Sequence, residues 1–420
     1  MTRMCLLVNQ YSYRHARVQR FAEALADAGA IVDMLCLRER NCTAIGEPRG
    51  VRVITIPVSR QIRDSKGLLF EYLAAFVLFS VRLLILHAKN RYDVIQVHNM
   101  PDFLVFAAFI PRLLGAKLIL DICDPMPEMY LSKTAGRGNG NLALRLIELE
   151  ERLSTALADA VTCANAHFKT CLVRRGVPAS KITVVNYVPD LRLFDPDLYS
   201  GEQHRASDQG DSPPFTLVYP GTLEPRYGLD LPIRALPGLI PAIPGIRLVI
   251  MGPYREHVDD LVTLAEQLGV SSFVEFKPPV PLNDVAAHLA EADVGLYAAI
   301  QDPHMSIAMP LKVLEYAAMG VPIIASRLKV LEEIFSDSAV LFFEPGDVEQ
   351  FAGCVLTLYL QPERRAELAR NAYDQFVACC SWRAEQQRYF ELLNHLLPAG
   401  ERLGAVAAKP QGKLWPEETA

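Results

Sequence analysis

Two side chains in the second half of the chain carry the sharpest chemical signal. Lys312 and Glu315 lie three residues apart in the run Ser306–Pro322, SIAMPLKVLEYAAMGVP. Pro310 suits the first turn of a helix and Gly320 suits its end, so Lys312 and Glu315 share one face near the helix N-terminus. A lysine there can meet a phosphate, and a carboxylate one turn deeper can accept hydrogen bonds from a diol. A surface ion pair is the simpler alternative, but it does not explain why so apolar a helix carries both charges at this end.

Glycines follow two predicted strands in the same half of the chain. The predicted strand 216–219 runs into Pro220-Gly221-Thr222, and the predicted strand 247–251 runs into Gly252. Glycine at such a turn lets backbone N–H groups approach a phosphate. The sequence contains neither G-x-G-x-x-G nor G-x-x-x-x-G-K-[ST], so a dehydrogenase cofactor site and a P-loop are both unsupported.

In the first half of the chain, polar residues follow five predicted strands. Ligands of open parallel sheets bind beyond the carboxyl ends of the strands. One polar residue at a strand end is ordinary turn chemistry, but a row of them along one edge favours a binding crevice. The residues are Asn9 and Gln10, His98 and Asn99, Cys123 and Asp124 with Asp121 just inside, Asn165, and Asn186.

The elements that must position these residues alternate along the 420-residue chain. Short apolar runs alternate with longer helical patterns, which is typical of parallel sheets covered by helices. A polar stretch rich in Gly, Ser, Asp and Pro indicates a linker. We predict an N-terminal domain at 1–195, a linker at 196–214, a C-terminal domain at 215–380, a helix at 381–397 that packs back on the first domain, and a mobile tail at 398–420.

Composition excludes several classes of protein. Hydrophobic residues make up 51% and charged residues 21%, which excludes a disordered chain. The formal net charge of −6 disfavours a nucleic-acid binder. Residues 1–200 carry 25 Lys and Arg against 19 Asp and Glu, so the two halves differ in charge. The nine cysteines form no C-x-x-C pair, and no secretory leader is visible, so we expect a reduced, cytoplasmic protein.

One apolar segment needs a membrane test. Residues 68–88 read LLFEYLAAFVLFSVRLLILHA, interrupted by Glu71 and Arg82. A spanning helix needs about 20 apolar residues, so a buried or partly interfacial helix is favoured. A helix lying on a bilayer surface is the alternative, with basic residues on both flanks.

These motifs resemble those of family 4 glycosyltransferases with the GT-B fold, the glycosyl transferases group 1. MPLKVLEYAAMGVPIIAS is similar to their donor-site signature, and YPGTLEPRYGLDLPIRAL to the first strand, loop and helix of their donor domain. HNMPDFLVFAAFIPRLLGAKLILDICDPMPEMY resembles the acceptor-domain segment of members that build bacterial surface polysaccharides. The resemblance covers roughly Met4 to Leu397. It implies an α/β fold of two Rossmann-like, doubly wound parallel-sheet domains that face each other across a cleft.

On the donor side, the resemblance implies that the second domain binds a nucleoside-diphosphate-sugar. Glu315 would bind the ribose hydroxyls, and Lys312 and Arg226 would neutralise the diphosphate. The positive charge and the helix N-terminus would stabilise the leaving group without a metal, so no metal or other cofactor is expected. The close loops beneath the diphosphate would be formed by Gly221, Thr222 and Gly252.

On the acceptor side, the resemblance implies retaining transfer of a sugar to a hydroxyl. The acceptor of such relatives is often a polyprenyl-diphosphate-linked glycan, which predicts a peripheral protein at the cytoplasmic membrane face and a role in exopolysaccharide synthesis. No nucleic-acid partner is expected. The catalytic candidates are His98, Cys123 and Asp124, and the acceptor candidates are Arg14, Arg17, Asn99 and Glu128.

The chain departs from the family pattern at three places. Many relatives have a further Glu where this chain has Ile307, so sugar contacts would come from elsewhere, such as the 302–306 loop. Relatives usually read Asp-x-His-Asp where this chain reads Asp121-Ile122-Cys123-Asp124, which removes a histidine expected near the reacting centre. An Arg often follows the donor-loop glycine where Thr222 stands, and Arg226 is expected to supply that charge.

Two other functions stay open at this point. One is a partner subunit that binds nucleotide-sugar but transfers it poorly, which the loss of that histidine keeps in play. The other is a different enzyme on the same fold, such as a sugar-nucleotide epimerase or a phosphorylase. An epimerase needs acid–base groups beside the donor sugar, and Ile307 and Cys123 argue against them; no lysine stands out for the pyridoxal phosphate of a phosphorylase.

Overall fold

The computed structural model describes residues 1–10, 16–38, 50–57, 65–134, 141–199, 214–254 and 256–404, without the side chains at 65–70, 141, 256 and 401. Arg14, most of the predicted linker at 196–214 and most of the predicted tail at 398–420 lie outside these residues.

The chain folds into two compact units, each with its own sheet. The first unit is Met1–Tyr187 together with Arg383 and the described residues after it, and the second is Val188–Trp382. The division falls before position 195 because Phe194 is buried in the core of the second unit, 1% exposed. The helix predicted at 381–397 belongs to the first unit.

A seven-stranded parallel sheet forms the centre of the first unit. Its strand order is β3-β2-β1-β4-β5-β6-β7. The chain reverses direction across the sheet between β1 and β4, which is where doubly wound sheets bind ligands. Almost every residue of the central strands is buried. The strands are β1 (Arg3–Val8), β2 (Ile31–Leu37), β3 (Val51–Ile56), β4 (Val94–His98), β5 (Lys117–Ile122), β6 (Ala160–Cys163) and β7 (Ile182–Val184).

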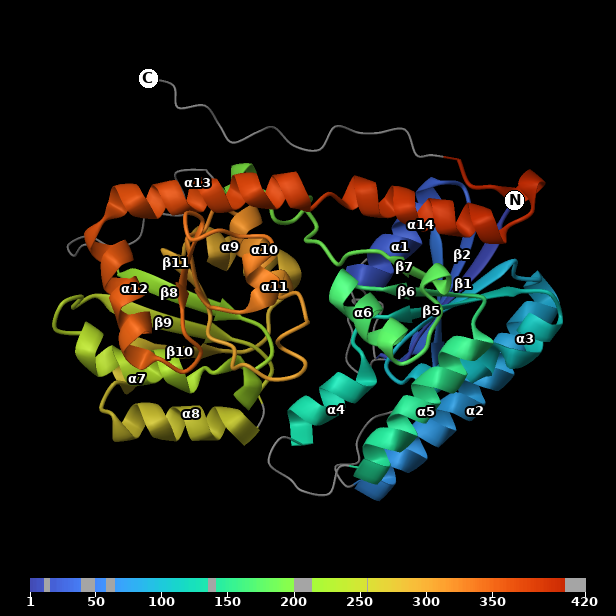
Figure 1. Cartoon of the computed structure of the whole chain (residues 1–420), viewed down its shortest axis with the longest axis horizontal. Helices are drawn as coiled ribbons and strands as arrows, with labels where there is room; N and C mark the ends of the chain where they lie inside the picture. The colour runs from blue at the N-terminus through green and yellow to red at the C-terminus, as the bar shows by residue number, and fades with distance from the viewer. Residues whose placement is uncertain are drawn as a thin grey trace. The chain divides into compact units, whose positions relative to one another are not determined.

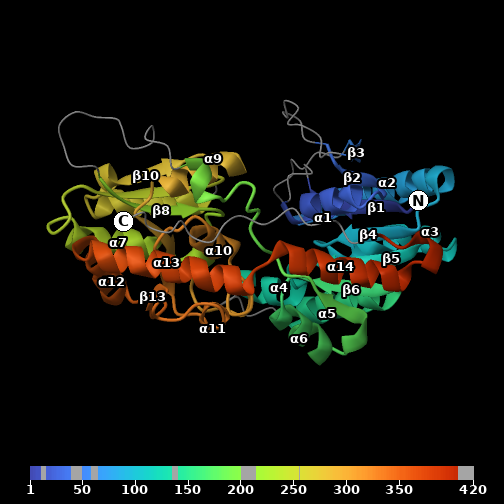
Figure 2. The ribbon, with the colours of Figure 1, turned by 90° about the horizontal axis from the view of Figure 1, so that it is seen from above.

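Helices cover both faces of this sheet (Figure 1). Helices α1 and α14 lie on one face, and α2, α3 and α5 lie on the other. Figure 2 shows α14 lying over β4 and β5, where Tyr389 donates a 2.5 Å hydrogen bond to Gln96 Oε1. The Tyr389 ring also lies 4.4 Å from the Phe21 ring of α1, centroid to centroid. The helices are α1 (Ala16–Asp27), α2 (Ser65–Asn90), α3 (Phe109–Leu113), α4 (Met126–Thr134), α5 (Asn141–Leu157), α6 (Ala166–Arg174) and α14 (Trp382–Leu396), with 3-10 turns η1 (Asp102–Ala108), η2 (Ala179–Lys181) and η7 (Ala399–Glu401).

The segment 102–114 does not form one α-helix but the 3-10 helix η1 followed by the short helix α3. Pro111 has no N–H to donate to the carbonyl four residues earlier, so a continuous α-helical ladder is interrupted there.

The second unit is built on a six-stranded parallel sheet with one hydrophobic core on each face. Its order is β10-β9-β8-β11-β12-β13. Helices α7, α8 and α12 enclose one core, and α9, α10 and α13 enclose the other. The strands are β8 (Phe215–Pro220), β9 (Ile246–Met251), β10 (Val274–Lys277), β11 (Val294–Tyr297), β12 (Ile323–Ser326) and β13 (Val340–Phe343). The helices are α7 (Asp230–Leu239), α8 (Glu256–Gln267), α9 (Leu282–Ala290), α10 (Leu311–Ala318), α11 (Lys329–Glu332), α12 (Val348–Leu360) and α13 (Pro362–Cys379), with 3-10 turns η3 (Pro196–Tyr199), η5 (Pro225–Tyr227) and η6 (Ser271–Phe273).

Candidate functional sites

Helix α10 in the second unit carries Lys312 and Glu315, and its two ends follow the sequence prediction. Extended backbone at Pro310, with φ −77° and ψ 104°, precedes the first helical residue. Gly320, with φ +64°, ends the helix in the left-handed conformation that favours glycine. The helix packs tightly on β11, because a Cβ at Gly295 would lie 2.5 Å from the Tyr316 ring.

The Lys312 ammonium group lies among three tyrosine rings. Its Nζ atom is 4.6 Å from the Tyr219 ring centroid, 4.2 Å from that of Tyr227 and 5.4 Å from that of Tyr297. It donates a 3.0 Å hydrogen bond to Tyr219 Oη, which in turn donates to the Thr222 carbonyl at 3.0 Å. Burial lowers the pKa of Lys312 to about 7, the Glu315 charge opposes this shift, and the Arg226 charge adds to it.

Glu315 is buried one turn further along α10, with 9% of its side chain surface exposed. Burial raises the pKa of this carboxyl to about 7, against the effect of the Lys312 charge. Because both pKa values are about 7, neither the protonated lysine nor the ionised carboxylate predominates near neutral pH. An anionic ligand would favour the protonated lysine, and ligand hydroxyls would favour the ionised carboxylate.

The glycines predicted beside a phosphate leave space in the structure, and their N–H groups donate to backbone carbonyls of neighbouring strands. The Gly221 N–H is bonded to the Met251 carbonyl at 2.8 Å, and the Gly252 N–H to the Lys277 carbonyl at 3.1 Å. A Cβ at Gly252 would lie 1.9 Å from the Gly221 oxygen, and one at Gly221 would lie 2.9 Å from Lys312 Cε. Extension of the sheet thus already uses these two N–H groups, and the position of the glycine loops beneath a diphosphate stays a prediction.

Arg226 lies on η5 close to the same cluster. It forms a 2.7 Å ion pair with Glu224, and its guanidinium carbon lies 5.4 Å from the Tyr227 ring centroid. Its carbonyl accepts a 3.0 Å hydrogen bond from the Ile300 N–H. This bond joins η5 to the segment that leads into the 302–306 loop, where Asp302 Oδ1 accepts the N–H groups of His304 and Met305 at 2.8 and 2.7 Å.

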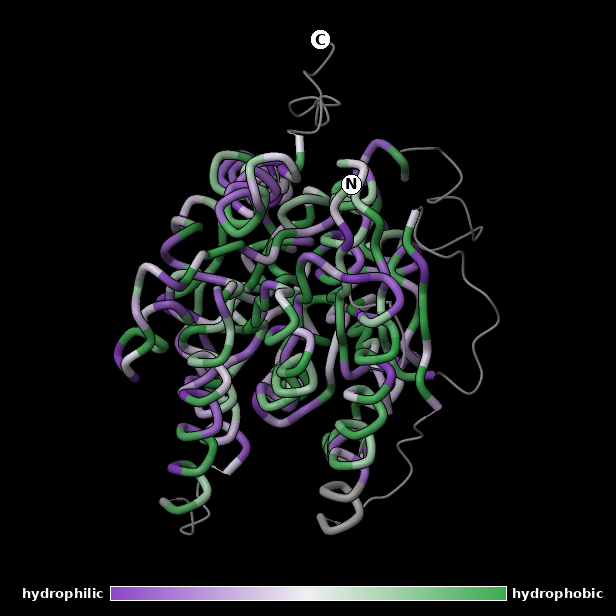
Figure 3. Tube along the Cα trace, turned by 90° about the vertical axis from the view of Figure 1, so that its right-hand side faces the viewer, coloured by the Kyte–Doolittle hydropathy of each residue, from purple (hydrophilic) through white to green (hydrophobic). Residues whose placement is uncertain are grey.

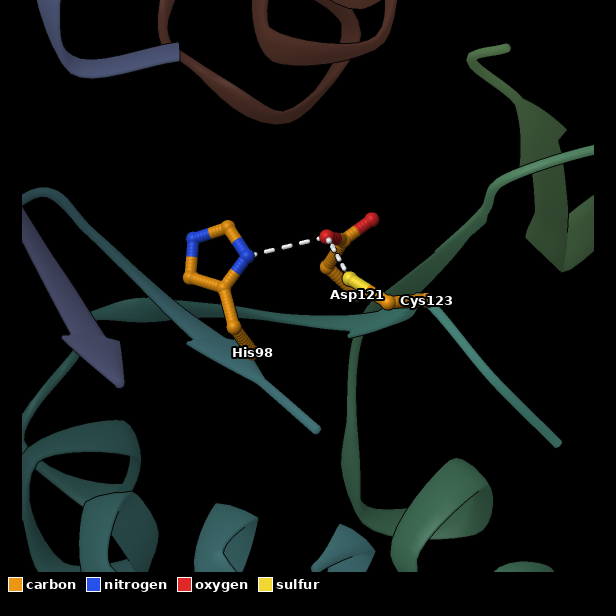
Figure 4. Close-up of side chains that lie close together, drawn as sticks. All are labelled: His98, Asp121 and Cys123. Carbon is orange, nitrogen blue, oxygen red and sulfur yellow. Dashed lines mark hydrogen bonds and ion pairs between the residues drawn. The ribbon is translucent and has the colours of Figure 1, made fainter. Parts of the chain in front are cut away.

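In the first unit, Asp121 is the centre of a buried hydrogen-bond cluster. Strand register places His98 beside Asp121 and Asp121 beside Thr162 on three adjacent strands. His98 Nδ1 lies 2.9 Å from Asp121 Oδ2, and Thr162 Oγ1 donates to Oδ1 at 2.6 Å. Arg17 of α1 donates to both carboxylate oxygens, at 3.0 and 2.8 Å. Cys123 Sγ donates to Oδ2 at 3.2 Å, and Figure 4 shows His98 and Cys123 approaching this oxygen together.

Burial and the contacts within this cluster determine the protonation of Asp121 and Cys123. Burial alone would raise the pKa of Asp121, but the Arg17 charge and hydrogen bonds from His98 and Arg17 outweigh it and hold that pKa well below its usual range. His98 Nδ1 faces the ionised Asp121 at 2.9 Å. Among the described residues, the buried Nε2 atom of His98 has no hydrogen-bond partner. Burial and the Asp121 charge raise the pKa of Cys123 well above its usual range, so the thiol stays protonated.

His98, Asp121 and Cys123 could also be considered as metal ligands, since one ligand atom from each lies within 4.8 Å of the others. The Arg17 guanidinium binds both oxygens of Asp121, and its charge would repel a cation placed there. A protonated thiol is moreover a poor ligand. The chemistry of this set fits a hydrogen-bond cluster better than a metal centre.

Asn99 holds the loop that carries two of the catalytic candidates. Its Oδ1 accepts the N–H groups of Cys123 and Asp124 at 2.8 and 3.4 Å. Its Nδ2 donates to the Asp124 carbonyl at 2.6 Å and to Asp102 Oδ1 at 2.9 Å. The amide group of Asn99 is therefore occupied in positioning this loop, and its contact with the acceptor stays a prediction.

Two more acceptor candidates are engaged inside the unit. Arg17 is 2% exposed, and its Nη1 atom also donates to the Val185 carbonyl at 2.7 Å. Glu128 forms an ion pair with Arg175, which also binds Glu151. Each charge is neutralised by a partner far away in the sequence, and the acceptor contacts of Arg17 and Glu128 stay predictions.

Two asparagines of the predicted polar row have structural roles as well. Asn165 Oδ1 caps α6 by accepting the Phe168 N–H at 2.8 Å. Asn186 binds the Glu385 carboxylate of α14 through its N–H and its side-chain amide, at 2.8 and 2.9 Å.

Sequence reasoning missed the three tyrosines around Lys312. Tyr219 and Tyr297 lie on β8 and β11, and Tyr227 follows Arg226. The search for polar residues at strand ends passed over aromatic ones, although an aromatic face attracts a cation. Thr162 was also missed, because only the register with β5 shows that it faces Asp121.

The fold agrees with what comparison with known proteins shows. The family described as Glycosyl transferases group 1 matches residues 201–375, and the Glycosyl transferase 4-like domain matches residues 15–187. The chain belongs to the family 4 glycosyltransferases and is an enzyme of that class with the GT-B fold.

Curated relatives are similar over different lengths. A GDP-mannose-dependent alpha-(1-6)-phosphatidylinositol monomannoside mannosyltransferase from Mycolicibacterium smegmatis is 31% identical over 56% of this chain and 62% of its own length. A D-inositol 3-phosphate glycosyltransferase from Thermomonospora curvata is 26% identical over 89% of this chain and 88% of its own.

Solved structures share the fold at low identity. Sucrose-phosphate synthase from Thermosynechococcus elongatus has a TM-score of 0.73 at 18% identity, covering 94% of this chain and 99% of that one. WaaG, a glycosyltransferase involved in lipopolysaccharide biosynthesis, has a TM-score of 0.67 at 18% identity with the same coverage. Anabaena HepE in complex with UDP-glucose has a TM-score of 0.67 at 16% identity, covering 94% and 100%.

Proposed function

We propose that this enzyme transfers a sugar, with retention of anomeric configuration, from a nucleoside-diphosphate-sugar to a hydroxyl of a lipid-linked glycan. The observation that carries the donor assignment is the buried Lys312–Glu315 pair at the start of α10. A lysine with a pKa of about 7 is ready to take up a proton when a diphosphate arrives. The carboxyl beside it gains hydrogen bonds when ribose hydroxyls approach.

The helix and its lysine also suit the departing group. Bond breaking at the sugar leaves negative charge on the diphosphate. The Lys312 ammonium group and the N-terminal end of α10 would stabilise that charge without a metal ion. Arg226, whose charge already acts on Lys312, adds to the positive potential.

A lipid-linked acceptor is supported by two observations. The mannosyltransferase relative acts, by its name, on phosphatidylinositol monomannoside, which is a lipid. On one face of its sheet, the first unit also has the apolar helix α2 and exposed aliphatic side chains on α3 and α5. The proposed acceptor is a polyprenyl-diphosphate-linked glycan used in surface polysaccharide synthesis, and the proposed location is the cytoplasmic face of the membrane.

Substitution of Glu315 tests the donor site. Glu315→Ala should weaken binding of the cognate nucleoside diphosphate by about 10- to 100-fold, because a hydrogen bond to a charged group contributes about 1.5–3 kcal/mol. Calorimetric titration with UDP and with GDP measures this change. Glu349→Ala, at an exposed position of α12 in the same unit, is the matched control. Unchanged affinity in Glu315→Ala would refute the assignment.

A partner subunit of low activity is the second candidate function. The Cys123 thiol stands where the resemblance leads us to expect a histidine, and its raised pKa prevents it from acting as a base near neutral pH. Radiolabelled sugar incorporated into a lipid fraction supports the transferase. Nucleotide-sugar binding without incorporation supports the partner subunit.

A further inference from the structure

The outer surface of α2, α3 and α5 is unusually apolar. Large aliphatic side chains on these helices are exposed, at 56% for Val77, 54% for Ile85, 66% for Leu113 and 57% for Leu146. Val81 and Leu153 continue the same stripes at 52% and 51%. We call these six residues the apolar helix face.

The three helices belong to one layer of the first unit. Right-handed crossovers place them on the same side of the sheet, and η1 packs against both α2 and α5. The inner side of α2 is already satisfied, because Phe79 and Leu83 are fully buried and Phe76 makes an edge contact with Phe103 of η1. In Figure 3 the coloured part of α2 is largely hydrophobic. A helix that is apolar on both sides is normally covered on both sides.

Helix α13 shows that an outer helix surface of this chain can be polar. The outer side of α13 exposes Glu363, Arg364, Glu367 and Arg370. Single exposed apolar residues are ordinary on soluble proteins, whereas a patch extending over three neighbouring helices marks an interaction surface.

The charges among these side chains indicate what covers the face. On the described side chains of α2, α3 and α5, the exposed charged residues are Arg82, Lys89, Arg145 and Arg152, with Glu148 as the one acidic group. A second copy of this chain would bring like charges together, which disfavours self-association. The surface of an anionic bilayer has the complementary charge and an apolar interior into which aliphatic side chains can insert.

The burial of α2 fits a position on a bilayer surface better than a position across the bilayer. Residues Glu71–Asn90 are long and apolar enough to span a membrane by length and composition. However, Ala75, Phe79 and Leu83 belong to the core of the first unit, at 4%, 0% and 0% exposed. A spanning orientation would remove these side chains from the protein core.

We propose that the apolar helix face docks on an anionic lipid bilayer, with Val77, Leu113 and Leu146 inserted and Arg82, Lys89 and Arg145 at the level of the headgroups. This inference rests on the proposed lipid-linked acceptor, because the same docking would bring the first unit to its substrate.

Vesicle sedimentation of the full chain tests the docking. Wild type should pellet with vesicles of equal parts phosphatidylglycerol and phosphatidylcholine, and much less with phosphatidylcholine alone. Raising the salt from about 0.1 M to about 1 M, which shortens the Debye length from about 10 Å to about 3 Å, should reduce binding. Val77→Asp with Leu146→Asp should lower partitioning on the order of tenfold or more. Arg82→Gln with Arg145→Gln should lower it roughly tenfold or more.

Matched controls are available in the second unit. Leu360→Asp changes an aliphatic residue that is 69% exposed, and Arg364→Gln changes an exposed arginine. Both should pellet like wild type. Affinity for UDP or GDP in vesicle-free solution should be unchanged in all these variants, which separates docking from the donor site.

Three outcomes would overturn the proposal. Wild type could fail to pellet with anionic vesicles, or the docking variants could pellet as wild type does. Sedimentation velocity could instead show a dimer that Val77→Asp with Leu146→Asp dissociates, which would make a second copy the occupant. Loss of donor binding in Glu315→Ala alone would leave the docking result unaffected.

Discussion

Lys312 shows how one buried cation can be prepared for an anion that has not yet bound. Its pKa falls from the ordinary lysine value of 10.5 to about 7 because burial disfavours the charged form. Between these two values the unfolded lysine binds a proton that the folded one does not, so the contribution of this residue to stability declines as the pH falls towards 7. A diphosphate reverses the preference by supplying opposite charge.

Donor affinity should therefore depend on pH through Lys312. Above pH 7, binding of UDP or GDP requires proton uptake, so affinity should fall by up to about tenfold per pH unit. Calorimetry in two buffers of different ionisation enthalpy measures the uptake directly. Lys312→Met keeps the length of the side chain and should bind more weakly, without the loss of affinity above pH 7 that deprotonation of Lys312 causes. A flat profile in wild type would mean that Lys312 is already charged when the site is empty.

The side chain at position 123 determines whether a thiol or an imidazole lies beside Asp121. Asp121 accepts the thiol proton and holds the sulfur in place. If the site is that of a transferase, Cys123→His should preserve or raise sugar transfer, because imidazole can also donate to Asp121. Initial rates of label incorporation measure this, with Cys171→His as the control. A sharp loss of transfer in a folded Cys123→His variant would mean that the pocket requires the smaller thiol.

At the scale of elements, local signals and long-range contacts differ in what the sequence reveals. Helix α10 was predictable because Pro310 and Gly320 mark its ends within the segment itself. The alternation of strands and helices was predictable for the same reason. Arg17 could not be assigned to Asp121 because the two residues lie 104 positions apart, and only the folded sheet brings them together.

The same limit applies to the candidate sites. The position of Lys312 and Glu315 on one helix follows from their spacing, whereas the three tyrosines around Lys312 come from β8, β11 and η5. Nothing in the sequence around Glu128 indicated that Arg175 is its ion-pair partner. The sequence indicated which polar residues lie at strand ends. It could not separate those that cap a helix or hold a loop in place from those that remain available to a ligand.

Helix α14 is held on the first unit by a buried carboxylate. Glu385 is 2% exposed and accepts hydrogen bonds from Asn186 and Arg388. Glu385→Ala should lower the free energy of unfolding of the first unit by about 1–3 kcal/mol, because the Asn186 donors lose their partner. Chemical denaturation measures the change. Glu391→Ala, exposed on the same helix, should have little effect; equal effects of the two variants would contradict the anchoring role.

At the scale of the whole molecule, two separate cores predict two responses to heat. The first unit and the second unit each enclose their own sheet. UDP or GDP at about 100 times its Kd adds about 2.7 kcal/mol to the stability of whatever binds it. Scanning calorimetry should show a transition of the second unit raised by about 5–10 °C, with the other transition almost unmoved. An equal shift of both transitions would contradict independent units.

The return of the chain at α14 also affects how the protein is made. The ribosome delivers Met1–Tyr187 early, but Tyr389, which covers Phe21 and Gln96, emerges only after Val188–Trp382. At 5–20 residues per second that delay is roughly 10–40 s. During this time α1 is present on that face of the nascent N-terminal sheet but α14 is not, whereas the later unit is contiguous and can close alone. Demand for chaperones should therefore centre on the half of the protein that is synthesised first.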